Sequence, residues 1–233
     1  MRFGKIDYLN LLPFEVFVRS YPKHSQFMLF FNKKKSYPSH LNKEFLFNRI
    51  EAGFVSSITA LRAKKERFYA LNTGIIAKKE VLSVICLLNE SGTDYQSATS
   101  NALLKVLRLK GRVLIGDRAL KEVLKQKEKS ENNFIDLAKM WIKKENLPFV
   151  FGRLCVKKNH NFYKNMLESF HKKRIKIPQY LLDKAAKQSG IAKKDIKEYL
   201  KVLSYKIDKK AEFGVERFYR NLRILQIKPP KRF

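Results

Sequence analysis

Short apolar runs alternate along this chain with segments whose apolar residues recur every three or four positions. The runs predict strands, and the segments predict amphipathic helices. The predicted strands cover residues 2–6, 27–31, 52–55, 69–76, 81–88, 112–115 and 147–156. The predicted helices cover residues 14–19, 41–50 and 58–65, follow the polar residues 97–100, and begin near residues 119 and 133. This alternation predicts an α/β fold, in which the β-branched run 81–88 is dense enough for a central strand.

After about residue 160 the pattern is almost wholly helical and rich in lysine. Two helices there carry apolar stripes, formed by Ile196, Leu200 and Leu203 and by Phe213, Val215, Phe218, Leu222 and Leu225. Stripes of this kind usually face a core. We therefore expect the C-terminal helices to pack back on the first half of the fold, and a nucleic-acid-binding appendage is the alternative.

Composition and charge narrow the class of protein. The 233 residues are 45% hydrophobic, which is enough for one large core or two small ones. The formal net charge is +29, from 50 Lys and Arg against 21 Asp and Glu, and it favours anionic partners such as nucleic acid. However, the lysines occur along the whole chain, and the runs 33–35 and 172–174 are short and lie in no recognisable nucleic-acid motif. A solvated, lysine-rich surface explains the same composition.

The cysteines and the N-terminus suggest a soluble cytoplasmic protein. Cys86 and Cys155 lie in apolar, strand-like settings, too far apart in the sequence for a CxxC pair, so we expect buried thiols in a reducing compartment. Arg2 is followed by a predicted strand and not by the apolar region of a signal peptide. The longest apolar run, 81–88, is far shorter than the roughly 20 residues that span a bilayer.

Several enzyme classes lack their motifs in this chain. There is no P-loop and no GxGxxG after a predicted strand, so nucleotide cofactors are unsupported. No Cys/His pair and no GxSxG nucleophile motif is visible. The four histidines have no metal-ligand spacing, and they are His24, His40, His160 and His171. We therefore expect neither a metal enzyme nor a covalent hydrolase.

Small polar residues at strand-to-helix turns remain as candidates for chemistry. Residues 5–14, KIDYLNLLPF, place Asn10 between a predicted strand and a helix with a proline near its start. Ser56 and Ser57 form a second such turn, and residues 97–100 form a third. The free N–H groups of helix N-termini suit carboxylates. Helix capping explains any one turn alone, but three turns at the carboxyl ends of strands would converge on one cleft.

The turn at Asn10 also carries a resemblance to a known family. KIDYLN followed by a proline is similar to the opening of the chorismate dehydratases of the futalosine route to menaquinone. Further segments resemble that family in the same order: GFVSSI at 53–58, VLSV at 81–84, SATSNALL at 97–104, IGDRAL at 115–120, DLAKMW at 136–141, LPFVF at 147–151 and GVERFY at 214–219. The ordered set covers nearly the whole chain. The sister enzyme of the route, which makes dihydroxynaphthoate, shares the fold but opens with a serine- and proline-rich motif that this chain lacks.

The resemblance implies a two-lobed α/β fold like that of the type II periplasmic binding proteins, with a ligand cleft between the lobes. Lobe one would comprise residues 1–88 and about 170–233, and lobe two would comprise residues 89–169. The chain departs from the family in being unusually rich in lysine. It also has Ser56 and Ser57 where some relatives have a proline-containing turn.

The resemblance further implies the dehydration of chorismate to 3-[(1-carboxyvinyl)oxy]benzoate. The ring loses the C4 hydroxyl and the C3 proton and becomes aromatic, so the reaction needs no cofactor. The substrate is a dianion, which suits helix N-termini and a positive field. The expected partner is thus chorismate, without nucleic acid, membrane or metal. A non-catalytic small-anion binding protein of the same fold is the second hypothesis, and a basic nucleic-acid-binding protein is the third.

The same resemblance, joined to the polar turns, implies a set of site residues. Asn10 and Ser83 are the expected catalytic residues. The expected substrate-binding residues are Tyr8, Ser56, Ser57, Ser97, Thr99, Ser100, Asn101, Asp117 and Phe151. Asn10 would hold the leaving hydroxyl or an adjacent carboxylate, while Thr99 and Ser100 would bind a carboxylate from lobe two. Because the motifs contain few acids or bases, we hypothesise that the protein positions and electrostatically stabilises the substrate, one of whose own carboxylates takes the proton.

Some residues of these motifs have equally simple structural explanations. Asp7 and Asp117 could each cap the turn beside them. Trp141, Phe149 and Phe151 could form a wall against the aromatic product or be ordinary core aromatics.

Overall fold

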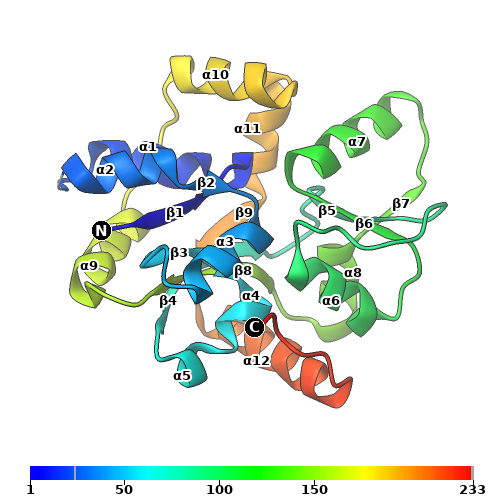
Figure 1. Ribbon diagram of the computed structural model, residues 1–233. Helices are drawn as coiled ribbons and strands as arrows, with labels where there is room; N and C mark the ends of the chain where they lie inside the picture. Colours follow the sequence, from blue (N-terminus) through cyan, green and yellow to red (C-terminus); the bar gives the residue numbers. More distant parts are fainter. Residues whose placement is uncertain (24, 232–233) are drawn as a thin grey trace.

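Two β-sheets organise the chain in the computed structural model, which describes residues 1–23 and 25–231 (Figure 1). The larger sheet has the strand order β2 (Lys35–Ser36), β1 (Phe3–Ile6), β3 (Ala52–Ser56), β8 (Phe149–Val156), β4 (Tyr69–Ala77) and β9 (Leu203–Lys206). The smaller sheet has the order β6 (Arg112–Ile115), β5 (Val84–Leu87) and β7 (Phe134–Asp136). Strand β1 is parallel to both of its neighbours, whereas β8 is antiparallel to β3 and β4.

Helices surround both sheets (Figure 1). Those of the first half are α1 (Leu12–Ser20), α2 (Ser25–Lys33), α3 (Pro38–Leu46), α4 (Ser57–Ala60) and α5 (Ala63–Glu66). The smaller sheet is covered by α6 (Ala98–Leu107), α7 (Gly116–Glu128) and α8 (Leu137–Glu145). The C-terminal part supplies α9 (His160–Lys172), α10 (Gln179–Ser189), α11 (Lys193–Lys201) and α12 (Lys209–Ile224).

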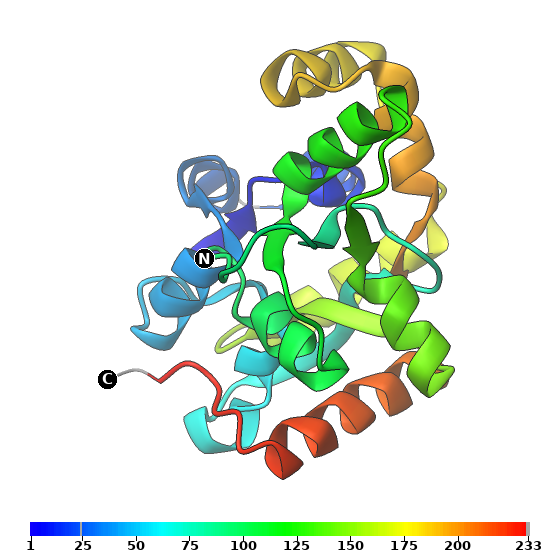
Figure 2. The same ribbon diagram turned by 90° about the vertical axis from the view of Figure 1, so that its right-hand side faces the viewer.

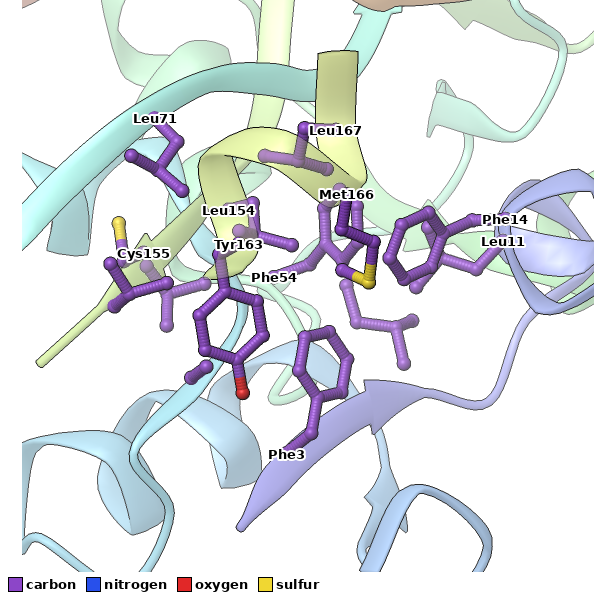
Figure 3. Packing of buried hydrophobic residues seen from close by; sticks show 14 of the residues in the cluster. Phe3, Leu11, Phe14, Phe54, Leu71, Leu154, Cys155, Tyr163, Met166 and Leu167 are labelled. Carbon is purple, nitrogen blue, oxygen red and sulfur yellow. The ribbon is translucent and has the colours of Figure 1, made fainter. Parts of the chain in front are cut away.

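Aromatic side chains fill the core of lobe one, which contains the larger sheet. The Phe3 ring lies 5.5 Å from Phe31, 5.6 Å from Phe27 and 6.0 Å from Phe14, measured between ring centroids. Figure 3 shows Phe3 of β1 below Tyr163 of α9, with Phe14 beside them. These ring contacts pack β1 against the helices on one face of the sheet. They thereby fix the position of the turn that follows Ile6.

In the lobe that contains the smaller sheet, successive side chains of β5 pack on opposite faces of that sheet. Ile85 and Leu87 pack against Ala119 and Val123 of α7, while Cys86 faces the opposite side, where α6 and α8 lie. Side chains of a strand point alternately to its two faces, so a central strand that is buried on both sides must be apolar throughout. Strand β5 is central in its sheet, as the run 81–88 predicts.

The sheet pairing also shows where the chain passes between the lobes. Strand β5 pairs with β6 and β7 and so belongs to the smaller sheet, although it precedes the expected boundary at residue 88. Strand β8 pairs with β3 and β4 in the larger sheet, although it falls within the expected lobe two, 89–169. We therefore propose that the crossings lie near residues 80 and 147, and that lobe one includes β8 and α9.

The prediction of a strand at 27–31 is wrong, because this segment lies in helix α2. Phe27 and Phe31 are buried on one side of the helix, four residues apart, while Leu29 between them is exposed. A five-residue apolar run has the length of a strand, and its periodicity does not distinguish a strand from part of a helix. The packing of both rings against Phe3 decides the matter.

Two expected helices are shortened or divided. The segment 41–50 is helical only within α3, which stops before Asn48, whose φ of 61° is left-handed. The segment 58–65 forms two short helices, α4 and α5. Ser56 precedes α4, but its side chain makes no capping hydrogen bond to that helix.

The extended and helical segments around the smaller sheet also differ in length from the prediction. The run 81–88 pairs only over β5, because Leu82 has a φ of 58° and interrupts the extended backbone. The helix expected to begin near residue 133 begins at Leu137 as α8, and Phe134 lies in the preceding strand β7. Trp141 itself is fully buried, against Phe149 and Phe218.

The C-terminal helices pack on the rest of the molecule. Their buried side chains include Ile196, Val215, Phe218 and Leu222, whereas Phe213 and Leu225 are exposed. Leu203 lies in β9, an edge strand that the helical pattern hid. Helix α12 packs on β8 and also lies beside α6 (Figure 2). Its Arg217 forms an ion pair of 3.6 Å with Glu145 of α8, so this helix contacts both lobes.

Further sequence expectations concern the thiols, the membrane and metals. Cys86 and Cys155 are buried and free, as expected. Within residues 1–23 and 25–231, no helix has the length and apolar character that crossing a bilayer requires. In the same residues no group of three His, Cys, Asp or Glu could hold a metal ion. His24 lies outside the described part of the chain.

Candidate active site

A narrow cavity lies where the two sheets face each other. The room inside it for the centre of a water-sized sphere is about 40 Å³, within about 500 Å³ of space that is free of protein atoms and partly open to solvent. Its polar lining consists of Tyr8, Asn10, Ser56, Ser83, Ser97 and Ser100. Phe151 and Ile75 of the larger sheet, with Val84 of the smaller one, are among its apolar walls. Both lobes therefore contribute polar groups to one space.

The structure brings together seven of the eleven expected site residues. Asn10, Ser83, Tyr8, Ser56, Ser97, Ser100 and Phe151 line the cavity. The other four are outside its lining and make hydrogen bonds within the protein. The Ser57 hydroxyl donates to the Val150 carbonyl, and Thr99 Oγ1 accepts from the Ile58 N–H at 3.1 Å.

Asn101 and Asp117 likewise hold neighbouring loops. The Asn101 side chain exchanges hydrogen bonds of 2.9 and 2.8 Å with the backbone of Asp94. The Asp117 carboxylate accepts from the Leu9 N–H at 3.0 Å, across the interface between the lobes. These hydrogen bonds tie the four residues into the framework around the cavity, outside its lining.

Asn10 has the least satisfied polar group in the cavity. It lies in a single 3₁₀ turn, η1 (Leu9–Leu11), between β1 and α1. Its side-chain Oδ1 is buried and has no hydrogen-bond partner within the described residues. Its backbone carbonyl accepts a hydrogen bond of 2.7 Å from the Tyr205 hydroxyl, which fixes the turn. Buried polar atoms in folded proteins are nearly always paired, so a bound ligand is the natural partner for this one.

Ser83 is held by its neighbours on both sides. Its carbonyl accepts from the Gly116 N–H at 2.8 Å, and its Oγ accepts from the Tyr199 hydroxyl at 2.9 Å. The preceding N–H groups of Val81 and Leu82 donate to the buried carboxylate of Asp136 at 2.9 and 2.7 Å. This anchor holds the left-handed backbone of Leu82 and thereby sets the direction in which Ser83 points.

Two helix N-termini of the smaller lobe open onto the cavity. Ser97 caps α6 by accepting from the Ser100 N–H at 3.1 Å and donates to Ser100 Oγ at 2.8 Å. The hydrogen of the Ser100 hydroxyl is therefore available to a ligand. Helix α7 begins at Gly116, which also lines the cavity. The partial positive charge of both termini favours an anion there.

Ser56 is more tightly bound than the other cavity hydroxyls. Its Oγ accepts from the Asn42 amide at 2.6 Å and shares a hydrogen bond of 3.0 Å with Thr59. Its own N–H donates to the Asn42 Oδ1 at 2.9 Å. Ser56 therefore shapes the floor of the cavity more than it offers a free group.

The lobes touch at the mouth of the cavity. The Tyr8 hydroxyl donates to the Gln96 side chain, and the Ser39 N–H donates to the Gln96 carbonyl at 3.0 Å. A Cβ on Gly116 would lie 2.8 Å from the Tyr8 ring, so only glycine permits this approach at a φ of 66°. Burial raises the pKa of Tyr8, so its phenol stays protonated and acts as a donor.

Asp117 is a buried carboxyl group at this interface, and we expect it to make stability depend on pH. Burial raises its pKa from 3.8 to about 6, although the Leu9 N–H opposes the shift. The folded state binds the proton of Asp117 more tightly than the unfolded chain does. The proton therefore contributes fully to the free energy of unfolding below pH 3.8, and this contribution is lost as the pH rises through about 6. Asp117→Asn should raise the free energy of unfolding by about 1 kcal/mol at pH 7.5, with little effect near pH 4.

Urea unfolding of both proteins between pH 4 and pH 8 measures this difference. The asparagine side chain of the Asp117→Asn variant would keep an oxygen that accepts from Leu9, so the comparison isolates the charge. A difference that stayed constant over the whole pH range would contradict the assignment.

Two larger hollows lie elsewhere on lobe one. One contains about 1280 Å³ and the other about 1150 Å³ of free space, and both include His171 and Lys206. Lysines and apolar side chains of α9, α11 and β9 line the first of them. They lack the polar turns at strand ends, and neither contains any of the eleven expected site residues.

Comparisons with known proteins show similarity in sequence to one family and one relative. A family described as menaquinone biosynthesis matches residues 106–223. The chain is 42% identical over 229 residues to a chorismate dehydratase of Campylobacter jejuni subsp. jejuni serotype O:23/36 (strain 81-176), covering 97% of this chain and 100% of the relative.

Solved structures show the same fold at low identity. A protein of Archaeoglobus fulgidus aligns with a TM-score of 0.63 at 12% identity, over 97% of this chain and 98% of that one. The alkanesulfonate-binding protein SsuA of Xanthomonas axonopodis pv. citri, bound to MOPS, aligns with a TM-score of 0.54 at 11% identity, over 100% and 96% of the two chains. The fold is therefore that of the periplasmic binding proteins, as the family resemblance implies.

Proposed function

The chain belongs to the menaquinone-biosynthesis family that includes chorismate dehydratase, and on that premise we propose that it dehydrates chorismate in the cavity between its lobes. The products are 3-[(1-carboxyvinyl)oxy]benzoate and water, which makes the protein a hydro-lyase. The 42% identity to chorismate dehydratase over 97% of this chain confirms the resemblance to this family along nearly the whole sequence.

One observation carries the location of the reaction. Asn10 Oδ1 is a buried acceptor without a partner in the described structure, and it lies in a cavity that also contains Ser83 and Ser100. Leaving such an atom unpaired costs about 1 to 3 kcal/mol, which a bound ligand with hydroxyl groups would recover. Chorismate carries a hydroxyl at C4, the group that leaves.

Charge supports the same assignment. Chorismate is a dianion, and the N-termini of α6 and α7 both open onto the cavity. Ser100 has a hydroxyl hydrogen to donate beside the first of these termini. We assign one substrate carboxylate to Ser100 and the N-terminus of α6. Thr99 supports this wall from behind through its bond to Ile58 and does not bind the carboxylate itself.

The chemistry requires removal of one proton and one hydroxyl. The C3 proton passes to a carboxylate of the substrate, and the electron pair of the C3–H bond forms the new ring double bond. The C4–O bond breaks, and the hydroxyl leaves as water by taking the proton that the substrate carboxylate received from C3. The polar side chains of the cavity are hydroxyls and one amide, which are poor bases and good hydrogen-bond partners. They suit a role in positioning the substrate and stabilising developing charge.

Aromatisation of the ring drives this elimination, so we propose that it proceeds without a cofactor. We also propose a cytoplasmic location, which the two buried free thiols support, since free cysteines are usual in reducing compartments.

Turnover of chorismate by the purified protein tests the proposal. The protein is incubated with chorismate and EDTA, without nucleotide, and the product is followed by mass and by aromatic absorbance. We expect a product lighter by one water, formed at a rate proportional to protein concentration. Binding of chorismate without any turnover would contradict the proposal and favour a non-catalytic anion-binding protein of the same fold.

A further inference from the structure

Tyr199 reaches the cavity wall from the C-terminal part of the chain. It lies in α11 and is only 4% exposed. Its hydroxyl donates to Ser83 Oγ at 2.9 Å, a contact between residues 116 positions apart in the sequence. Ser83 Oγ has no second hydrogen-bond partner among the residues that the structure describes. The hydrogen bond thus connects a buried phenol directly to one expected catalytic hydroxyl.

The number of hydrogens decides what this contact does. A serine hydroxyl has one hydrogen and two lone pairs, and the Tyr199 donor occupies one lone pair. The hydrogen of Ser83 is then left without an acceptor in the described part of the protein. Ser83 lines the cavity, so a ligand there can accept this hydrogen. Burial raises the pKa of Tyr199, which keeps the phenol protonated and able to donate.

The backbone around Ser83 is fixed independently of Tyr199. Gly116 holds the Ser83 carbonyl, and Asp136 holds the turn before it. The remaining freedom of Ser83 is therefore rotation of its side chain and of its O–H bond. Tyr199 restricts both, because the hydroxyl must keep a lone pair directed at the phenol.

We propose that Tyr199 is a positioning residue, which orients the Ser83 hydroxyl so that it donates its hydrogen to the substrate. This inference rests on the proposed function and deepens it, since it names the residue that makes the Ser83 hydroxyl a hydrogen-bond donor toward the substrate. The group that accepts from Ser83 is a carboxylate or the departing oxygen of the substrate, because both are acceptors. Tyr199 does not itself line the cavity.

The chain offers a matched control for this residue. Tyr219 of α12 is a partly buried tyrosine, and its hydroxyl donates at 2.8 Å to the backbone carbonyl of Ser57. That carbonyl belongs to a residue outside the cavity lining. Tyr199→Phe and Tyr219→Phe therefore each remove a phenol oxygen that donates one hydrogen bond, to the Ser83 hydroxyl in the first case and to a backbone carbonyl in the second.

Steady-state kinetics with chorismate tests the proposal. We expect Tyr199→Phe to lower kcat about tenfold with a small change in KM, and Tyr219→Phe to keep kcat within about twofold of wild type. Melting temperatures of the two variants serve as the measure of folding. Equal effects of the two substitutions on kcat would overturn the proposal.

A double-mutant cycle separates positioning from general structural support. If Tyr199 acts through Ser83, then Tyr199→Phe should have little effect when it is added to Ser83→Ala. A double variant whose loss in kcat equals the product of the losses in the two single variants would overturn the proposal. Absence of turnover by the wild-type protein would overturn the proposed function and this inference together, whereas an active wild type with a fully active Tyr199→Phe variant would overturn this inference alone.

Discussion

Asn10→Ala is expected to lower kcat for chorismate dehydration about a hundredfold or more without lowering the free energy of unfolding. Removal of one well-placed hydrogen-bonding group from an active site typically costs a factor of about 10² to 10³. The side chain makes no hydrogen bond that holds the described fold together, because its Oδ1 has no partner there. The turn itself is held through the Asn10 backbone carbonyl, which the substitution keeps.

The measurement combines kcat with the free energy of unfolding in urea. Asn165→Ala is a suitable control, because Asn165 lies on the exposed side of α9, outside the cavity. It should leave both quantities within error of wild type. Full activity of Asn10→Ala would remove Asn10 from the catalytic assignment, and a loss of activity that tracked a loss of stability would show that its role is structural.

Asp136→Ala should have the largest effect on stability among the residues behind the cavity. Asp136 is only 5% exposed, and its carboxylate accepts hydrogen bonds from three backbone N–H groups, those of Val81, Leu82 and Lys139. Alanine would leave these donors without acceptors, at about 1 kcal/mol or more each. We expect the free energy of unfolding to fall by about 3 kcal/mol, and kcat to fall as well, because the turn before Ser83 loses its anchor.

Asp136→Asn provides the graded comparison. Asparagine has one side-chain oxygen, which can still accept from Val81 and Leu82 but cannot also accept from Lys139. Its loss of stability should therefore lie between wild type and Asp136→Ala, with most of kcat retained. Urea unfolding and steady-state kinetics measure both effects. A loss below about 1 kcal/mol in Asp136→Ala would contradict the anchoring role.

Local sequence signals were sufficient to predict the polar turns at Asn10 and Ser97, which line the cavity. Asn10 follows an apolar strand and precedes a proline-bearing helix, and Ser97 begins a helix with its own side chain as the cap, so each turn has a short-range cause. The order of the motifs also identified the family and hence the two-lobed fold. The turn signals depend on residues within one helical turn of each other, whereas the family resemblance depends on the order of motifs along nearly the whole chain.

What the sequence did not show depends on distant contacts. The hydroxyls of Tyr199 and Tyr205 reach Ser83 and Asn10 from 116 and 195 positions away, and no periodicity marks such partners. Ser57 and Thr99 looked equivalent to Ser56 and Ser100, because a hydroxyl at a helix start can face a cavity or a neighbouring backbone group. Only the packing of the elements decides between these orientations.

The same limit explains the errors in the fold. The run at 27–31 has the composition of a strand, and its burial on one helical face follows from the position of Phe3 in the neighbouring strand. Strand β8 follows the smaller lobe in the sequence but pairs between β3 and β4. Strand pairing across such separations is set by the tertiary fold and not by the local pattern.

A crystal structure of the Asn10→Ala variant soaked with chorismate would test the central claim most directly, because a slow enzyme retains its substrate. We predict chorismate between the lobes, with a carboxylate at Ser100 and the N-terminus of α6, the ring beside Phe151, and the Ser83 hydroxyl within hydrogen-bond distance of a substrate oxygen. Chorismate bound instead in the lysine-lined groove of α9, α11 and β9, with the cavity at residue 10 empty, would contradict the assignment of the active site.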